Sequence, residues 1–537
     1  MRYTLLFLLF PFLISAQDSW NMTLLGSLDY PTSQGNDIWG WVDSDGNEYA
    51  LVGLRKGFSV VNVTNPASPI EEFFIADSNS VWRDIKTWGN YAYVTTEANA
   101  GLLIVDLTDM TGNTYWHVTQ FTNSNTGASV TFTSAHNLYI DENGVCYIFG
   151  AGSNSGSNPS SGVIFLDVDV NPTNPVYLGS WNDAYVHDAM VRGDTMWACC
   201  ISIGKLFVVD VSNKAKPITL TSWSTPNEFT HNAWISDDGN YVYTTDERSN
   251  AYIAAYDVSD LSNIQEVDRI QSNPGSGSMP HNTHVDGNFL VTSYYRDGTT
   301  VHDITNPENM VQVAYYDSYF GIGEGFDGCW GTYPFLPSGN IISSDRNSVP
   351  GGFGTAKLLI YQRGFQQACY LQGTVKDGFT SSVITNARIN ILSDTIYENT
   401  NLLGFYQTAS VNSGTFQVVF SAFGYMSDTL TVSLVNGVMT ILNATLYPLV
   451  LIPDVFTPNG DGLNDFFAPI LKPESYTSYN IKIYNKWYQL IYNKDNTPWD
   501  GKVNGVLLGE GPFSYFITVS FEAQSPFIFT GLINILK

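Results

Sequence analysis

The chain has 537 residues, of which 44% are hydrophobic and 14% are charged, and its formal net charge is −27. A chain of this length exceeds one ordinary hydrophobic core, so we expect several domains. The acidity disfavours nucleic acid and anionic membrane surfaces as partners, because phosphate binding needs basic patches. The 46 glycines, 23 prolines and 14% aromatic residues are typical of turn-rich all-β structure and argue against disorder.

The first residues have the pattern of a secretory signal peptide. Arg2 supplies a positive charge, residues 4–14 form an apolar run, and Ser15 and Ala16 make a small-residue cleavage site. We therefore expect residues 1–16 to be removed on export. The apolar run is too short to cross a bilayer, and we expect no membrane-spanning segment in the mature chain.

A short aliphatic and β-branched run recurs along residues 18–365. It is clearest at residues 205–212, KLFVVDVS, and most copies end in Asp or Asn followed by a turn. The other copies lie at residues 57–64, 101–108, 162–168, 252–259, 298–305 and 357–362. Apolar runs punctuated in this way are strands, and strand-rich repeats spaced roughly 40 to 60 residues apart indicate a β-propeller. We predict seven blades of four strands.

The last repeat lacks a fourth strand, and the N-terminal segment is predicted to supply it. Residues 22–28, MTLLGSL, resemble the fourth strands PVYLGSW and PITLTSW of other repeats. Pairing between the two ends would close the ring and remove its exposed edges. We therefore expect residues 18–365 to form one cooperative unit.

These repeats resemble those of the LVIVD-repeat proteins, in the group called choice-of-anchor B. The resemblance covers roughly residues 20–365 and depends on the runs quoted above. It implies a secreted or surface-exposed propeller and carries no established activity.

A two-residue signature opens the first strand of each repeat. The copies are Trp39-Gly40, Arg83-Asp84, His136-Asn137, His187-Asp188, His231-Asn232, His281-Asn282 and Trp330-Gly331. Because first strands line the channel of a propeller, we expect the four imidazoles to converge at one end of it. The polar residues just after the second strands should lie at the same end, since the second strand runs antiparallel to the first.

Imidazoles and carboxylates in a concave site are typical metal ligands. We predict a transition metal (zinc, copper or iron) at His136, His187, His231 and His281. The expected supporting polar residues are Asp84, Asp188, Glu97, Asp246, Glu247 and Arg296. The alternative is structural: the histidines and their Asn or Asp neighbours would hydrogen-bond loop backbones and hold blade against blade.

Three further histidines are predicted to play smaller roles. His284 follows His281 by three residues, and we expect it on the opposite strand face as a weaker candidate. His117 and His302 are expected to be structural. Among the five cysteines, Cys146, Cys199 and Cys200 lie in predicted strands and are expected to be small buried hydrophobes, with one disulfide left open.

Residues 366–448 predict a small β-sandwich of about seven short strands. The stretches QGTV at 372–375, NARI at 386–389, GFY at 404–406 and FGY at 423–425 resemble a carboxypeptidase regulatory-like domain. The resemblance implies a structural spacer or weak binder, and we assign it no catalytic residues.

Residues 449–537 carry a more specific resemblance. The runs IPDVFTPNGDGLNDFF, YNIKIYNKWYQLIY and FIFTGLINILK resemble the gliding-motility-associated C-terminal domain, the type B sorting signal of type IX secretion. One departure is NKWY at 485–488, where the usual pattern has Arg and Gly. The resemblance implies export through the periplasm to the outer surface of a Gram-negative bacterium, with the type IX secretion machinery as a partner. The loop at 459–465 offers oxygen ligands at spacings that suit calcium, or that form a turn.

The sequence thus predicts an all-β protein, a seven-bladed propeller followed by two small β-sandwiches. Its expected function is extracellular binding of a glycan, peptide or matrix ligand, with Trp39, Trp82 and Trp330 as aromatic platforms if the channel end holds no metal. The alternative is a metal-dependent extracellular enzyme, an oxidase or hydrolase, that uses the same histidines. Gly-x-Ser-x-Gly, His-Glu-x-x-His and P-loop motifs are all missing from the sequence.

Overall fold

The computed structural model describes residues 18–152, 162–352, 354–392, 397–471, 476–522 and 525–536. The expected signal peptide, residues 1–16, lies outside the described residues. The chain divides into two compact units, Met1–Ala368 and Cys369–Lys537. No helix in the described part of the chain is long and apolar enough to span a bilayer.

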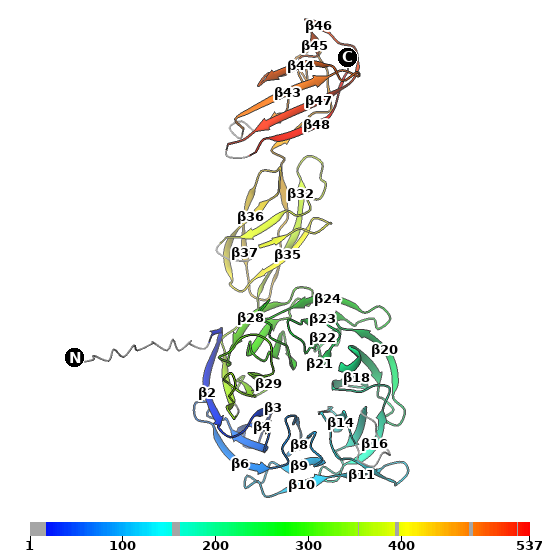
Figure 1. Ribbon diagram of the computed structural model, residues 1–537, viewed down its shortest axis with the longest axis vertical. Coiled ribbons are helices and arrows are strands. Elements are labelled where there is room, and N and C mark those ends of the chain that lie inside the picture. The colour runs from blue at the N-terminus through cyan, green and yellow to red at the C-terminus, as the bar shows by residue number, and fades with distance from the viewer. Residues whose placement is uncertain are drawn as a thin grey trace, which may run out of the picture. The chain divides into compact units, whose positions relative to one another are not determined.

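The described strands of the first unit form seven sheets, which succeed one another around a common axis (Figure 1). The first sheet contains β3 (Gly35–Val42), β4 (Glu48–Leu54), β5 (Gly57–Asn62) and β6 (Ile70–Ala76). The second contains β7 (Ile85–Trp88), β8 (Tyr91–Val94), β9 (Leu102–Asp106) and β10 (Tyr115–Val118). The third contains β11 (Gln120–Asn123), β12 (Ser129–Thr131), β13 (Asn137–Ile140), β14 (Val145–Phe149), β15 (Val163–Asp167) and β16 (Val176–Trp181). The fourth and fifth contain β17 (Asp188–Arg192), β18 (Thr195–Cys200), β19 (Lys205–Asp210) and β20 (Ile218–Ser224), with a short 3-10 helix at Ile201–Ile203; and β21 (Thr230–Ile235), β22 (Tyr241–Asp246), β23 (Ile253–Asp257) and β24 (Gln265–Ile270). The last two contain β25 (Thr283–Asp286), β26 (Phe289–Ser293), β27 (Thr299–Asp303), β28 (Val311–Tyr316) and β1 (Ser19–Trp20); and β29 (Cys329–Tyr333), β30 (Ile341–Asp345), β31 (Ala356–Arg363) and β2 (Met22–Tyr30).

The repeated run forms the third strand of each blade, and its acidic or amide end makes a turn. In six blades the Oδ1 atom accepts a hydrogen bond of 2.8 to 3.1 Å from the backbone N–H two residues later. The residues that accept it are Asn62, Asp106, Asp167, Asp210, Asp257 and Asp303. Such Asx turns end a strand without leaving the backbone donor unpaired, which explains why this position repeats.

The N-terminal segment joins the two ends of the ring. Strand β2 pairs antiparallel with β31, from Met22 opposite Arg363 to Tyr30 opposite Ala356. The preceding strand β1 adds to the sixth blade, where Ser19 and Trp20 pair with Tyr316 and Tyr315 of β28. The last two blades are therefore both tied to residues that begin the described chain.

The outer strand of the second blade is followed at once by a strand of the next blade. The chain leaves the second blade after β10 and enters the third blade as β11. There β11 pairs parallel with β16 and antiparallel with β12. A period-2 pattern cannot reveal this change, because both halves alternate in the same way.

The core of the propeller lies between adjacent blades. One buried cluster packs Leu51 and Val60 of the first blade against Val94 and Leu103 of the second. Similar clusters join the second blade to the third, the third to the fourth, and the seventh to the first. Because each sheet packs against both of its neighbours in this way, its inner strands are largely buried on both faces.

The second unit contains two sets of sheets. In the first set, β32 (Cys369–Asp377) pairs with β35 (Phe405–Ser410), β38 (Met439–Ile441) and β39 (Ala444–Leu446). The other sheet of this set contains β33 (Arg388–Ile391), β34 (Tyr397–Asn399), β36 (Gly414–Ser421) and β37 (Asp428–Leu434). One buried cluster with Leu371, Ile389, Tyr406 and Phe420 contains residues of both sheets.

The last set has a five-stranded sheet with two small pairs. The sheet contains β41 (Val455–Phe456), β43 (Ser478–Tyr484), β44 (Leu490–Asp495), β47 (Gly511–Ser520) and β48 (Phe527–Ile535), and the pairs are β40 (Val450–Leu451) with β42 (Ile470–Leu471) and β45 (Lys502–Val503) with β46 (Val506–Leu507). Trp499, which is fully buried, packs with Phe456, Phe467 and Ile517 in its core.

Candidate functional site

The pairing of first and second strands aligns the channel residues of all seven blades. At the first signature position the structure places Asn36, Arg83, His136, His187, His231, His281 and Trp330. The prediction was wrong in the first blade, where the aligned residue is Asn36 and Trp39 lies three positions further along. Strand β3 has a register shift between Gly35 and Ile38, and this bulge displaces the sequence alignment.

Four imidazoles stack around one end of the channel, as expected. The ring centroids of His136 and His187 are 3.9 Å apart, those of His187 and His231 4.3 Å, and those of His231 and His281 4.3 Å. With Trp82 and Trp330 they line one small pocket, which we call the channel mouth. The four imidazoles thus come from four neighbouring blades, one from each.

Within the described residues, three side chains at the mouth bring their ligand atoms together. The ligand atoms of His231, Glu247 and His281 all lie within 4.8 Å of one another. The Nε2 atoms of His231 and His281 are 3.8 and 3.9 Å from the Glu247 carboxylate. His136 instead contacts Glu97 through Nδ1 at 2.6 Å. The predicted set of four ligands is therefore divided, and Glu247, which was predicted as a supporting residue, lies with His231 and His281.

Hydrogen bonds orient two members of this group. His281 donates from Nδ1 to the backbone carbonyl of Trp330 in the next blade, which leaves the Nε2 lone pair facing Glu247. The hydroxyl of Tyr295 donates to Oε1 of Glu247 at 2.5 Å. Such outer partners set the tautomer of a histidine and the direction of a carboxylate. Tyr295 was not predicted; it follows the second strand of its blade, as Glu97 and Glu247 do, and that position is the signal that could have found it.

Burial makes the mouth a site of neutral imidazoles. Removal from water, reinforced by the neighbouring imidazoles, lowers the pKa of His187 and of His231 well below 6.5. Burial also lowers the pKa of His281 to about 3. Burial raises the pKa of Glu247 to about 7, against the opposing effect of the Tyr295 hydrogen bond. Neutral imidazole is the form that binds metal, so these histidines need lose no proton to do so.

The second signature residues form a separate layer that joins blades. Asn232 donates to Asp188 of the preceding blade at 2.7 Å and accepts from the backbone N–H of Thr283 of the next blade at 2.9 Å. Asp84 pairs with Lys86 at 3.4 Å, and Lys86 also lies 3.7 Å from Asp37. Asp84 and Asp188 line the next pocket along the channel, where these contacts serve the structural role that the sequence left open.

An aromatic layer fills the other end of the channel. Trp39 lies there, and its ring centroid is 4.8 Å from that of Tyr333. The ammonium group of Lys86 lies 4.3 Å from the centroid of the Trp39 ring. His284 was expected on the opposite face from its neighbours, but it packs against Trp234 with centroids 4.7 Å apart. The predicted face was wrong because a bulge stands at the start of the inner strands. With this bulge, both signature residues and the residue two positions after them, here His281, Asn282 and His284, turn toward the axis.

Other predicted residues have different surroundings. Asp246 accepts from Thr225 and from the backbone N–H groups of Asn227 and Phe229, and so ties down a loop. Arg296 donates to the backbone carbonyl of Ile322 and lies 3.7 Å from Asp327. Neither contact involves the histidines. Trp330 is buried, with Arg346 above its ring, whereas Trp82 is 39% exposed.

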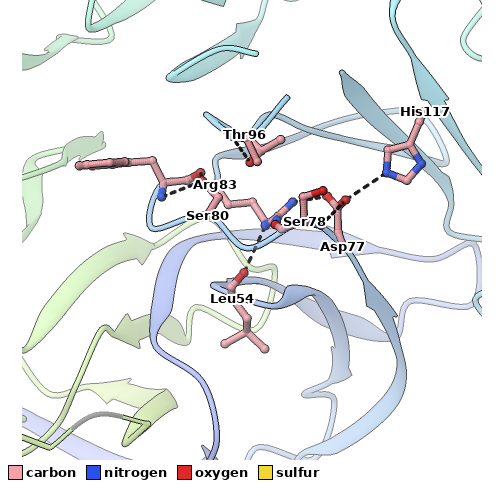
Figure 2. A network of polar contacts seen from close by, with 9 residues as sticks. Leu54, Asp77, Ser78, Ser80, Arg83, Thr96 and His117 are labelled. Carbon is pink, nitrogen blue, oxygen red and sulfur yellow. Dashed lines mark hydrogen bonds and ion pairs between the residues drawn. The ribbon is translucent and has the colours of Figure 1, made fainter. Parts of the chain in front are cut away.

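Arg83 occupies the histidine register in the second blade but has a structural role. Its side chain is buried and paired with Asp77 at 2.6 Å, and it donates to the carbonyls of Leu54 and Ser78 (Figure 2). Asp77 also contacts His117 at 3.3 Å. The guanidinium thereby holds the segment before Trp82 against the first blade, which a sequence alignment of the signature could not show.

The calcium prediction for residues 459–465 stays a prediction. Asp465 accepts from the backbone N–H groups of Gly460 and Gly462, and Asp461 accepts from that of Leu463. These bonds are the ones that a turn requires. Cys146, Cys199, Cys200 and Cys329 are buried free thiols.

Family comparisons support the assignment of two parts of the chain. The model of the LVIVD repeat matches residues 45–77, 82–112 and 198–225. The model of the CHU_C type IX secretion signal domain matches residues 450–535. The chain therefore contains LVIVD repeats in its propeller and a type IX secretion signal domain. The resemblances named for these two regions are thereby confirmed.

The LVIVD-repeat propeller is also similar to a solved structure. This is the crystal structure of the Cps50 (Swd1) β-propeller domain from Myceliophteria thermophila, with 10% sequence identity and a TM-score of 0.41, covering 62% of this chain and 99% of that one. Comparison with curated proteins finds no match. The secretion signal assigns the propeller to the outer surface or surroundings of a Gram-negative bacterium and makes the type IX machinery its partner.

Proposed function

We propose that the LVIVD-repeat propeller is an extracellular binding protein that holds a divalent transition metal at its channel mouth. The proposal is carried by one observation, the convergence of His231, Glu247 and His281 within 4.8 Å. Two imidazoles and one carboxylate suit zinc or iron. The orienting bonds from Tyr295 and to the Trp330 carbonyl are what a metal site needs in its surroundings.

The spacing of these atoms supports the proposal. Two ligands of a tetrahedral zinc ion, each about 2.1 Å from it, lie about 3.4 Å apart. The Nε2-to-carboxylate distances of 3.8 and 3.9 Å exceed that value by about half an ångström, so small side-chain movements would suffice. A metal would replace the proton that the raised pKa lets Glu247 keep near neutral pH.

The test is metal content after reconstitution. Purified wild-type protein, stripped and then dialysed separately against Zn²⁺, Fe²⁺ and Cu²⁺, should retain about one ion per chain by mass spectrometry. The variants His231→Ala and Glu247→Gln should retain less than about a tenth of this amount, because each loses a ligand. His117→Ala, which changes a histidine on the outer edge of a blade, is the matched control and should bind like the wild type. Equal metal content in the wild type and in His231→Ala would contradict the proposal.

A second candidate function is that of a metal-dependent enzyme. The observation that favours it is the number of protein ligands: three leave positions open for water, oxygen or a substrate. The reconstituted protein would then hydrolyse esters or consume oxygen, and Glu247→Gln would abolish both metal binding and turnover. That result would replace the binding hypothesis with the enzyme hypothesis.

A further inference from the structure

We infer that the open pocket beside the channel mouth binds a neutral saccharide, with one sugar ring stacked on Trp82. This deepens the proposed binding function by naming the class of ligand, and it concerns the side of the mouth formed by the first two blades. The side chains that carry the inference are Trp82, its supporting segment and the polar residues beside it.

Trp82 is an exposed aromatic side chain on a well-supported segment. It is 39% exposed, whereas Arg83, the next residue, is 1% exposed. The Arg83 guanidinium binds Asp77, the Ser78 carbonyl and the Leu54 carbonyl, as Figure 2 shows. A buried charge is costly unless fully paired, so these contacts hold the segment firmly in place.

Further bonds hold the segment on both sides of the indole. The hydroxyl of Ser80 donates to the Trp82 carbonyl at 2.6 Å and accepts from the Trp82 N–H at 3.2 Å. The side-chain amide of Asn36 donates to the Val81 carbonyl at 2.7 Å. An aromatic surface that is ordered before binding loses little entropy when a ligand arrives.

The indole borders an open pocket of about 320 Å³ that is lined by polar side chains as well as by Val81 and Ala98. Arg55, Asn79, Ser80 and Glu97 contribute to this lining. That volume is within the usual range for small-molecule sites. One apolar face next to several hydrogen-bonding groups matches a sugar ring, which has an apolar C–H face and hydroxyls at its edge.

The pocket lies beside the channel mouth. Trp82 lines both, and its ring centroid is 6.1 Å from that of His136. Glu97, in the open pocket, binds His136, in the mouth. A sugar on Trp82 would therefore lie next to the imidazoles and the proposed metal.

The charges at this pocket favour a neutral ligand. Arg55 donates to Gln34 and Glu97 binds His136, so the two charged side chains of the pocket already have partners in the protein. The formal charge of −27 disfavours polyanions such as uronic acid polymers at long range.

The test uses the full mature chain and a panel of immobilised neutral oligosaccharides: β-glucans, mannans, xylans and N-acetylglucosamine oligomers. The oligosaccharide bound most strongly is then titrated calorimetrically. We expect Trp82→Ala to weaken binding at least about tenfold, since an aromatic stacking contact contributes on that scale. Trp116→Ala is the matched control, because Trp116 is 37% exposed on the outer strand β10, and it should bind like the wild type.

A second variant and a chelator separate the possible failures. Trp82→Phe keeps an aromatic face and should retain most of the binding, while Trp82→Leu should lose it. Binding that persists in EDTA supports the inference even if the proposed metal is absent. Equal affinity of Trp82→Ala and the wild type, or binding only to peptides or oligouronates, would overturn the inference and leave the metal proposal standing.

Discussion

At the scale of single residues, burial determines the chemistry of the histidines. His187, His231 and His281 lie in a stack of rings whose neighbours are only 3.9 to 4.3 Å apart. Charged imidazoles at such distances would repel one another strongly, and their lowered pKa values keep them neutral at pH 7. The cluster is therefore stable as a packed unit and still has nitrogen lone pairs available.

His302 allows the cost of burying an imidazole to be measured away from the mouth. It is fully buried in β27, both of its ring nitrogens are without hydrogen-bond partners in the described structure, and burial lowers its pKa to about 3. Between pH 6.5 and 3 the unfolded chain binds the proton more readily, so this residue makes the fold less stable as the pH falls. At pH 5 the expected loss is about 2 kcal/mol, or about 1.4 kcal/mol for each pH unit.

The variant His302→Leu should remove that loss. Urea denaturation midpoints at pH 7 and pH 5 would show its stability relative to the wild type rising by about 2 kcal/mol at the lower pH. Between pH 7 and pH 8 the difference should stay constant, because the imidazole is then neutral in both states. A difference that is the same at pH 5 and pH 7 would contradict the predicted titration.

At the scale of elements, register decides which side chains meet. The bulge before the inner strands directs two consecutive signature residues to the channel, where a regular strand would direct only one. The first residues then form the mouth and the second residues join the blades. Pairing of β2 with β31 similarly determines where the ring closes.

Removing residues 18–29 should destabilise the whole propeller. The deletion eliminates β1 and nearly all of β2, which exposes the edge of β31 and the apolar surface beneath it. We expect a loss of the order of 5 kcal/mol, a large fraction of a domain's usual 5 to 15 kcal/mol, or failure to fold. Thermal melting followed by circular dichroism is the measurement. Deleting only residues 18–20 should cost less, and a protein without residues 18–29 that melts like the intact one would disprove the role of β2.

At the scale of the whole molecule, the chain combines a propeller with an export signal. The negative charge suits a solvated surface and is unfavourable for nucleic acid. The signal domain at residues 450–535 accounts for the route to the cell surface. The carboxypeptidase regulatory-like assignment of residues 366–448 stays a prediction, since the structure shows two sheets there without testing the family.

Deleting residues 449–537 should leave the protein in the periplasm. The secretion machinery recognises the C-terminal domain, so the truncated chain should keep the fold of its other domains but lose the signal that directs its export. Surface protease treatment of intact cells, followed by immunoblotting of cell fractions, should show at least about a tenfold drop in accessible protein. A chain that lacks residues 369–448 but keeps the tail is the control and should reach the surface. Undiminished display of the tail-less protein would refute the assignment.

The sequence alone determined the all-β propeller and the export signal, because both depend on local patterns: alternating strands, Asx turns such as that of Asp210, and a tail motif. It also placed His136, His187, His231 and His281 at one register. Only the tertiary structure decided that Glu247 joins His231 and His281, that Arg83 turns away to support Trp82, and that Asn36 replaces Trp39 in the aligned layer. These outcomes depend on bulges and on side-chain directions across neighbouring blades, which no linear pattern encodes.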